Sequence, residues 1–240
     1  MDQIVFFWSG EDLSIPKYFI NSILVRNLKK IKIIQVSDKK TKKIEGVDLF
    51  ITDDLPKDLM TARLKAYSKV ETENTNTIFC DADSLLLNDF TLTNFKSGYY
   101  LIKRKGNFVI NHLMPEHYPE FKNKLVLDVM PFLFGAIVIA KKENFFKYLY
   151  DICLKLPFRF HRWYGDQISL HLYYLDNKSK FNFFDQEKYM HVIGRKNKAN
   201  VDLNLLKKEG IIFLTFKGSE TKKSIKDFFD KIMLLNEVKN

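Results

Sequence analysis

The chain has 240 residues, of which 46% are hydrophobic and 28% are charged, a composition that is ordinary for a globular protein with a sizeable core. Its formal net charge is +10, and the basic residues are 33 Lys but only 6 Arg. Base-specific readout of nucleic acids depends on the planar fork of Arg, so we expect no nucleic-acid partner. A basic surface instead favours nucleotides, acidic glycans or the inner face of a membrane, which leaves peripheral membrane contact open.

The sequence also bears on where the protein resides. Acidic residues flank the short apolar run near the N-terminus, so we expect no signal peptide. The longest uninterrupted apolar stretch, residues 130–140, is too short to span a bilayer. Cys80 and Cys153 lie in apolar surroundings without the spacing of metal ligands, which is typical of reduced core thiols. Together these features predict a cytoplasmic protein.

Apolar runs and segments of helical spacing alternate along the chain. The expected strands are residues 4–8, 31–36, 47–52, 77–80, 99–103, 132–140 and 211–216. The expected helices are residues 18–28, 59–70 and 143–156, and a last helix that begins at Ser224. Strands that alternate with helices imply an α/β fold, in which helices flank a mostly parallel central sheet on both faces.

Two carboxylates, Asp81 and Asp83, directly follow the expected strand at residues 77–80. Open α/β sheets bind ligands at the carboxyl ends of their strands, and both side chains could turn toward one cation there. Oxygen ligands suit Mg²⁺ or Mn²⁺, ions that usually complete their coordination with water or phosphate oxygens. The alternative is a plain strand-to-loop turn, where Asp is also common.

In its order of segments, the chain resembles the GT-A glycosyltransferases, and within them glycosyltransferase family 8. The segments that carry the resemblance are residues 64–67, 78–87 and 89–90. In that family a helix with a basic residue leads to a strand that ends in Asp-x-Asp, and Lys65 has the spacing of the phosphate-contacting lysine. The resemblance implies one Rossmann-like GT-A domain over residues 1–240, of the nucleotide-diphospho-sugar transferase type. Residues 1–90 would form the nucleotide-binding half, and residues 91–240 the donor-sugar and acceptor half.

Three later segments extend the resemblance. They are Phe134-Gly135-Ala136, Gly165-Asp166-Gln167, and Phe216-Lys217-Gly218 followed by Lys222 or Lys223. In the family the first lines the donor sugar, the second lies beside the anomeric carbon, and the third closes the site with a lysine. The family's closing segment also supplies a His to the metal, and the matching residue here is Thr215. His191 is a candidate substitute for this third ligand.

By this resemblance the protein transfers a sugar from a nucleotide sugar, with UDP favoured, to a glycan or glycolipid acceptor in polysaccharide or lipopolysaccharide synthesis. Mn²⁺ or Mg²⁺ on Asp81 and Asp83 would act as a Lewis acid on the leaving diphosphate. Lys65, with Lys222 or Lys223, would add positive charge where negative charge develops.

The resemblance assigns roles to further residues. Asp166 would orient the donor sugar and Gln167 would face the acceptor in a retaining enzyme, where the leaving phosphate serves as base. The Asp-Gln pairing favours retention, whereas in an inverting enzyme Asp166 would be the base. Trp8 or Phe7 would stack on the nucleotide base and Ser9 would bond to it, although core packing is the alternative for both aromatic residues.

Two other classes of protein remain open. Haloacid-dehalogenase-like phosphatases also use Asp-x-Asp after a strand, but their motif usually opens the domain and continues with Gly or Thr. Here the motif lies a third of the way along the chain and continues with Ser84. A non-catalytic nucleotide- or glycan-binding relative is consistent with Thr215, which would weaken a metal site.

Overall fold

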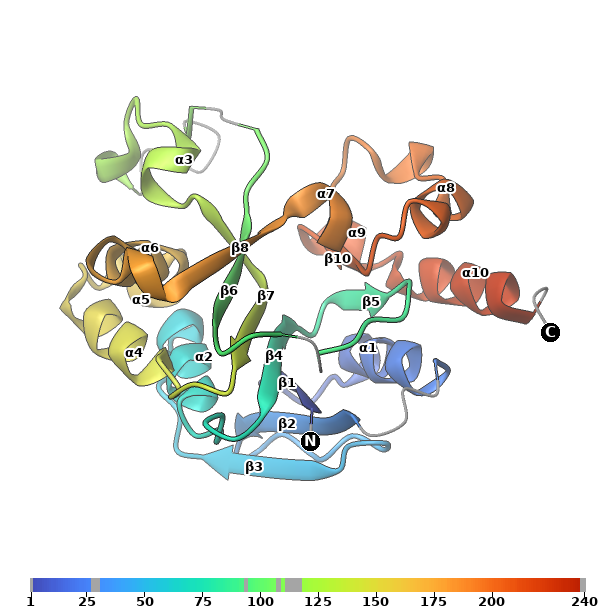
Figure 1. Cartoon of the computed structure of the whole chain (residues 1–240), viewed down its shortest axis with the longest axis horizontal. Coiled ribbons are helices and arrows are strands. Elements are labelled where there is room, and N and C mark those ends of the chain that lie inside the picture. The colour runs from blue at the N-terminus through green and yellow to red at the C-terminus, as the bar shows by residue number, and fades with distance from the viewer. Residues whose placement is uncertain (1, 27–30, 93–94, 107–108, 111–117, 238–240) are drawn as a thin grey trace.

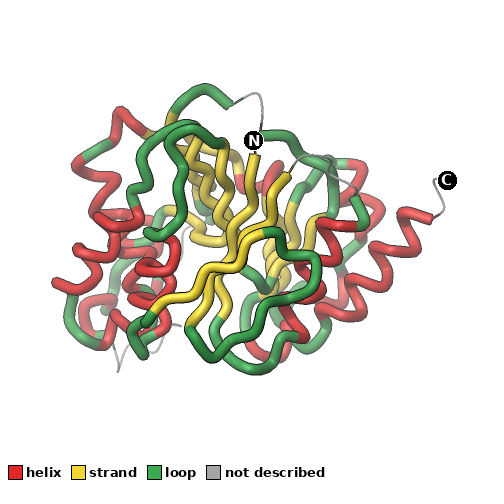
Figure 2. Tube along the Cα trace, turned by 90° about the horizontal axis from the view of Figure 1, so that it is seen from below, coloured by secondary structure: helices red, strands yellow, loops and turns green. Residues whose placement is uncertain are grey.

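The fold is described from a computed structural model, for residues 2–26, 31–92, 95–106, 109–110 and 118–237. A seven-stranded sheet runs through the middle of the molecule (Figure 1, Figure 2). Its strands, in spatial order, are β3 (Leu49–Asp53), β2 (Ile31–Asp38), β1 (Asp2–Trp8), β4 (Asn76–Asp81), β7 (Phe132–Ala140), β6 (Gly98–Lys103) and β8 (Phe181–Asp185). Strand β7 runs antiparallel to both of its neighbours, and the other neighbouring pairs are parallel. The predicted mostly parallel sheet is confirmed, with one reversed strand.

Helices cover both faces of this sheet, as predicted (Figure 1). The larger ones are α1 (Ser14–Leu24) on one face, and α2 (Leu59–Tyr67), α4 (Phe146–Lys155) and α6 (Gly165–Asp176) on the other. Successive side chains of a strand point to opposite faces. Accordingly, Ile4 and Phe6 of β1 pack in the cluster with α1, whereas Val5 and Phe7 pack in the cluster with α2, α4 and α6.

A second, three-stranded sheet lies beside the first. Its strands, in spatial order, are β5 (Ser84–Leu86), β10 (Phe213–Phe216) and β9 (Met190–Ile193). Strand β10 is antiparallel to β5 and parallel to β9. Helices α8 (Leu203–Lys208) and α10 (Ile225–Glu237) pack against it through one apolar cluster. Because β5 follows β4 almost at once, the chain passes from the first sheet to the second at the Asp-x-Asp motif.

The remaining helical segments are short. Within the described residues they are α3 (Val126–Val129), α5 (Arg159–Arg162), α7 (Gln186–Tyr189), α9 (Ser219–Lys222) and the 3₁₀ turns at Pro119–Phe121, Lys178–Lys180 and Lys198–Asn200. In the part of the chain that the structure describes, no helix combines the length and apolar character needed to cross a bilayer.

The expected elements are present, but several of their ends differ. The first helix begins at Ser14 and ends at Leu24, which is 47% exposed although the helical spacing places it on the buried face. The end predicted for this helix, at residues 27–28, lies outside the described residues. The sequence does not predict strands β5, β8 and β9, which have three, five and four residues and are too short to show a period.

Candidate active site

A cavity of about 560 Å³ opens at the carboxyl ends of β1 and β4, where the two sheets meet. Its walls come from both predicted halves of the chain, residues 1–90 and 91–240. The residues singled out in the sequence that line it include Phe7, Trp8, Ser9, Asp81, Asp83, Gly135, Gln167, Thr215, Gly218 and Lys222. Open α/β sheets bind ligands at this edge, so the cavity is the candidate active site.

The backbones of the two sheets hold the carboxylates of the Asp-x-Asp motif. Asp81 is the last residue of β4 and pairs with Phe7 of β1. The backbone nitrogen of Phe216, at the end of β10, donates to the carbonyl oxygen of Asp83 at 3.1 Å. Both side chains are thereby placed in one cavity, where they are only 10% and 12% exposed.

Three cations surround these two carboxylates. Nη1 of Arg63 lies 2.7 Å from Oδ1 of Asp81, and Nζ of Lys217 lies 3.0 Å from its Oδ2. Nζ of Lys222 lies 2.6 Å from Oδ2 of Asp83. Burial alone would raise the pKa of Asp81, but Lys217 and Arg63 outweigh it and hold that pKa at about 2. Burial would likewise lower the pKa of Lys217, but Asp81 and Asp83 outweigh it and raise that pKa.

Asp166 lies behind the cavity wall rather than on it. Its side chain is fully buried, and Oδ2 forms an ion pair with Nη2 of Arg63. Its Oδ1 accepts a hydrogen bond of 2.7 Å from the backbone N–H of Gln167, at the start of α6, where the helix dipole favours a negative charge. Arg63 therefore joins Asp81 to Asp166. The resemblance assigns Asp166 a direct contact with the donor sugar, whereas in this structure Asp166 is not part of the cavity lining.

Gln167 lines the cavity itself. Its Oε1 accepts a hydrogen bond of 2.8 Å from Nη2 of Arg104, and Nε of Arg104 donates to the carbonyl oxygen of Met130 at 3.0 Å. A guanidinium group has only donors, so it is the amide oxygen of Gln167 that must face Arg104. Among the described residues the two N–H groups of the amide have no partner, which leaves them for a ligand.

A tight turn between α5 and α6 positions the two residues that follow it. Tyr164 has a φ of +68°, which is unusual for a bulky side chain, and its ring packs edge-on against Tyr118. Gly165 comes next, and a Cβ there would lie 2.7 Å from Sγ of Cys153 and closer still to the carbonyl oxygen of Phe160. Only glycine lets α6 begin this close to α5.

The residues predicted to bind the nucleotide base lie at the end of β1. Nε1 of Trp8 donates to the carbonyl oxygen of Asp12 at 2.9 Å, which fixes the indole ring. The hydroxyl of Ser9 donates to the carboxylate of Asp38 at the end of β2. Phe7 is 7% exposed and packs in the core, so of the two aromatic residues Trp8 is the more accessible to a ligand.

Two of the predicted glycines also line the cavity. A Cβ at Gly135 would lie 3.0 Å from Cε of Met190, which is tighter than an ordinary contact, and 3.5 Å from Oδ2 of Asp81, which is an ordinary van der Waals contact. Gly218 has a φ of +91°, a conformation that favours glycine.

Besides Asp166, the predicted residues Lys65, Ala136 and His191 also lie outside the cavity wall. Nζ of Lys65 donates to the carbonyl oxygen of Asp54 at 2.6 Å, beyond the end of β3. Ala136 is buried in the core on the α1 side of the sheet. His191 is half-buried, and burial lowers its pKa, but only its two neighbours in β9 line the cavity. Alternation along a strand explains why His191 faces away.

Three cations of the cavity have no role in the sequence-based prediction. Arg63 lies two residues before Lys65 on α2. Side chains two positions apart on a helix point roughly 200° away from each other, so Arg63 and Lys65 cannot both enter the cavity. Only the packing of α2 shows that Arg63 is the one that does. Strand alternation is the signal that could have revealed Lys217, because this residue follows Thr215 by two positions. The sequence carries no signal for Arg104, whose partner Gln167 is distant in the chain.

The Asp-x-Asp motif implies a divalent cation at these two carboxylates. Three of the four carboxylate oxygens of Asp81 and Asp83 already contact protein cations. Within the described ranges, no His, Cys, Asp or Glu completes a group of three that could hold a metal. The fourth oxygen, Oδ1 of Asp83, and the hydroxyl of Thr215 are buried without a hydrogen-bond partner among those residues. As these side chains stand, the donor set does not fit a divalent cation.

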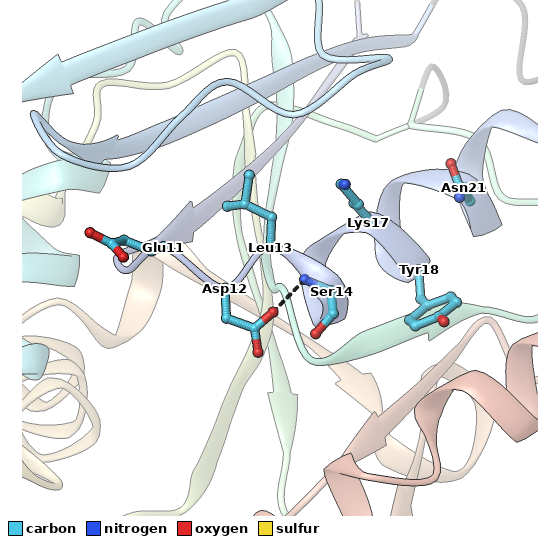
Figure 3. Close-up of a pocket in the computed structure, with 7 residues that line it drawn as sticks. All are labelled: Glu11, Asp12, Leu13, Ser14, Lys17, Tyr18 and Asn21. Atoms are coloured by element: carbon cyan, nitrogen blue, oxygen red, sulfur yellow. Dashed lines mark hydrogen bonds between the residues drawn. The ribbon is translucent and has the colours of Figure 1, made fainter.

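A second hollow lies at the start of α1 (Figure 3). In it the backbone N–H of Ser14 donates a hydrogen bond of 2.9 Å to Oδ1 of Asp12, which lowers the pKa of that carboxyl. Asp12 is thus used to begin the helix, and no chemistry is assigned to this hollow.

Comparison with known proteins supports the fold. No protein-family model and no curated protein matches the sequence. Among solved structures, the galactosyltransferase LgtC in complex with donor and acceptor sugar analogues superposes with a TM-score of 0.58, at 12% identity over 95% of each chain. The glycosyltransferase GlyE of Streptococcus pneumoniae TIGR4 gives 0.57 at 16% identity, over 99% of this chain and 63% of that one. The bifunctional glycosyltransferase WbbM also gives 0.57 at 16%, over 96% of this chain and 49% of that one.

These similarities establish the fold as that of GT-A glycosyltransferases, in agreement with the resemblance found in the sequence. The chain and LgtC match over 95% of the length of each. The chain spans only about two thirds of GlyE and about half of WbbM.

Proposed function

We propose that the protein is a glycosyltransferase that moves a sugar from a nucleoside-diphosphate sugar, with UDP as the first candidate nucleotide, to a glycan or glycolipid acceptor. The observation that carries this proposal is the group of three cations, Arg63, Lys217 and Lys222, at the carboxyl edge of a glycosyltransferase fold. Departure of the sugar leaves negative charge on the diphosphate. Cations already held in place stabilise that charge without reorganisation in the transition state.

The carboxylates of the cavity favour retention of configuration. Among the described lining residues, the carboxylates are Asp81 and Asp83, and both are in ion pairs. Asp166 is buried behind Arg63. No unpaired carboxylate therefore faces the sugar as a base or nucleophile. In the proposed reaction the acceptor oxygen attacks the anomeric carbon as its bond to phosphate breaks, and the acceptor proton passes to the leaving diphosphate.

Individual residues support this reaction by binding and orientation. Lys217 and Lys222 bind the diphosphate, and Arg63, held by Asp166, keeps Asp81 in place. The free N–H groups of Gln167 orient the sugar or the incoming acceptor. The acceptor class, a cell-surface glycan or glycolipid, rests on the resemblance alone. No step is assigned to Mn²⁺ or Mg²⁺, which the sequence predicts as cofactors and the assay includes.

Turnover of nucleotide sugars tests the proposal. Purified chain is incubated with a panel of UDP-, GDP-, CMP- and dTDP-sugars, with EDTA or Mn²⁺, and release of the nucleotide is measured. We expect one donor to be consumed, and Lys222→Met to slow its consumption roughly 10- to 100-fold, as expected for a lost charged hydrogen bond. Lys223 is the matched control, because its ammonium group pairs with Glu220 and is 70% exposed.

Two results would contradict the proposal. If a nucleoside diphosphate binds but no sugar donor is consumed in either buffer, the protein is a non-catalytic binding module. If Lys223→Met slows turnover as much as Lys222→Met, the cavity is not the site of reaction. NMR of the product anomer decides between retention and inversion.

A further inference from the structure

Lys217 directly follows β10 and lies on the same face as Thr215 of that strand. Side chains two residues apart in a strand point the same way, and the backbone N–H of Lys217 continues the pairing by donating to the carbonyl oxygen of Ile193 at 2.9 Å. Both side chains line the cavity. At the position of Thr215 the resemblance leads us to expect a metal-binding His. In this chain that His is replaced, and an ammonium group enters the cavity two residues later.

The ammonium group of Lys217 forms an ion pair with the carboxylate that a metal ion would use. Its Nζ lies 3.0 Å from Oδ2 of Asp81, whose Oδ1 is 2.7 Å from Arg63. Lys222 contacts Asp83 in the same way, at 2.6 Å. A divalent cation at these carboxylates would have to displace the protein cations or lie beside them, and like charges at such short distances repel.

The cavity wall carries excess positive charge without any added ion. Its described lining residues include four cationic side chains but only two anionic ones, namely Arg63, Arg104, Lys217 and Lys222 against Asp81 and Asp83. Asp166, directly behind the wall, pairs with Arg63, so the whole group keeps a formal excess of one positive charge. A diphosphate that enters the cavity therefore meets a wall of complementary charge.

We infer that Lys217 takes the place of the divalent cation, so that the donor's diphosphate binds to Lys217 and Lys222 without Mn²⁺ or Mg²⁺. This inference rests on the proposed function. An ammonium group has three donors, and the Lys217 side chain is 47% exposed, so it bonds Asp81 and a phosphate oxygen at the same time. Asp81 and Asp83 are then positioning residues that hold two ammonium groups in the cavity.

Calorimetric titration of the full chain with UDP, GDP, CDP and dTDP, in EDTA and in Mn²⁺, tests this inference. We expect the best of these nucleotides to bind in EDTA with a Kd within about threefold of its Kd in Mn²⁺. Lys217→Met keeps the length of the side chain but removes its charge, and should weaken binding in EDTA roughly 10- to 100-fold. Lys223→Met should bind as the wild type does. Thr215→His added to Lys217→Met should restore binding in Mn²⁺ only, since imidazole completes a metal site.

The outcomes separate this inference from the proposed function. Binding by the wild type that requires Mn²⁺ would overturn the inference and leave the glycosyltransferase proposal intact. Unweakened binding by Lys217→Met in EDTA would do the same. Failure of all four nucleotides to bind in both buffers would overturn both. Circular dichroism of each variant shows that a loss of binding is not a loss of fold.

Discussion

Nη2 of Arg104 lies 2.8 Å from Oε1 of Gln167, and this hydrogen bond fixes which end of the Gln167 amide faces the cavity. Arg104 is itself fixed, because its backbone N–H donates to the carbonyl oxygen of Pro131 at 2.8 Å and its Nε donates to that of Met130. The segment after β6 thereby sets the orientation of a side chain at the start of α6.

Replacing Arg104 by Met should impair Gln167. Without its partner the amide can turn over, so we expect kcat to fall about tenfold, as for one hydrogen bond lost in the transition state. Gln167→Ala should cost a similar factor. Because the two residues act as a unit, the double variant should be no slower than the slower single variant. Steady-state kinetics of the three variants measure this coupling. If the double variant loses as much kcat as the product of the two single losses, Arg104 does not act through Gln167.

Removal of Arg63 should destabilise the fold. Arg63→Met leaves the fully buried Asp166 without its ionic partner, a change that typically costs about 3–5 kcal/mol. For a chain of this size we expect the melting temperature to fall by roughly 6–20 °C. Lys65→Met on the same helix is the control, because Nζ of Lys65 contacts the carbonyl oxygen of Asp54 and the partly exposed carboxylate of Asp53, and its loss should change the melting temperature little. Equal shifts in melting temperature for the two variants would show that the ion pair between Arg63 and Asp166 does not stabilise the fold.

The pKa of Asp81 predicts a pH dependence of stability. Because this pKa is about 2 in the folded chain and 3.8 ordinarily, ionised Asp81 stabilises the fold above about pH 4, and that contribution is lost between about pH 4 and pH 2. The contribution is about 2 kcal/mol. The Asp81→Asn variant lacks this ionisable group and its contribution at every pH. The free energies of unfolding of wild type and variant should therefore converge as the pH falls. Urea unfolding across this range measures the difference, and a constant difference would contradict the role of Lys217 and Arg63 at Asp81.

The parts of the site that could be predicted are those with a local cause. Asp81 and Asp83 follow an apolar strand that the structure confirms as β4, and strand ends in such sheets bind ligands. The contact from Lys217 to Asp81 joins residues 136 positions apart and depends on β5, which is too short for a pattern to reveal. In the same way, the sequence places Asp166 in a motif but cannot show that Arg63 covers it, because that depends on how α2 and α6 pack.

Gly165 should be intolerant of even one methyl group. A Cβ there would lie 2.7 Å from Sγ of Cys153 and closer still to the backbone of Phe160, which cannot move without shifting α5. Gly165→Ala should therefore push the start of α6 away and cost about 1–3 kcal/mol, as overpacking in a core usually does. Turnover should fall further than this loss of stability explains, because Asp166 and Gln167 follow directly and small displacements of positioned groups cost up to about 100-fold.

Gly194→Ala is the matched control, since its Cβ would meet only Oδ1 of Asn197 at 3.8 Å and its backbone is free of strain. Melting temperature and donor consumption are measured for both variants. Full activity in Gly165→Ala would show that the close approach of α5 and α6 does not position the site.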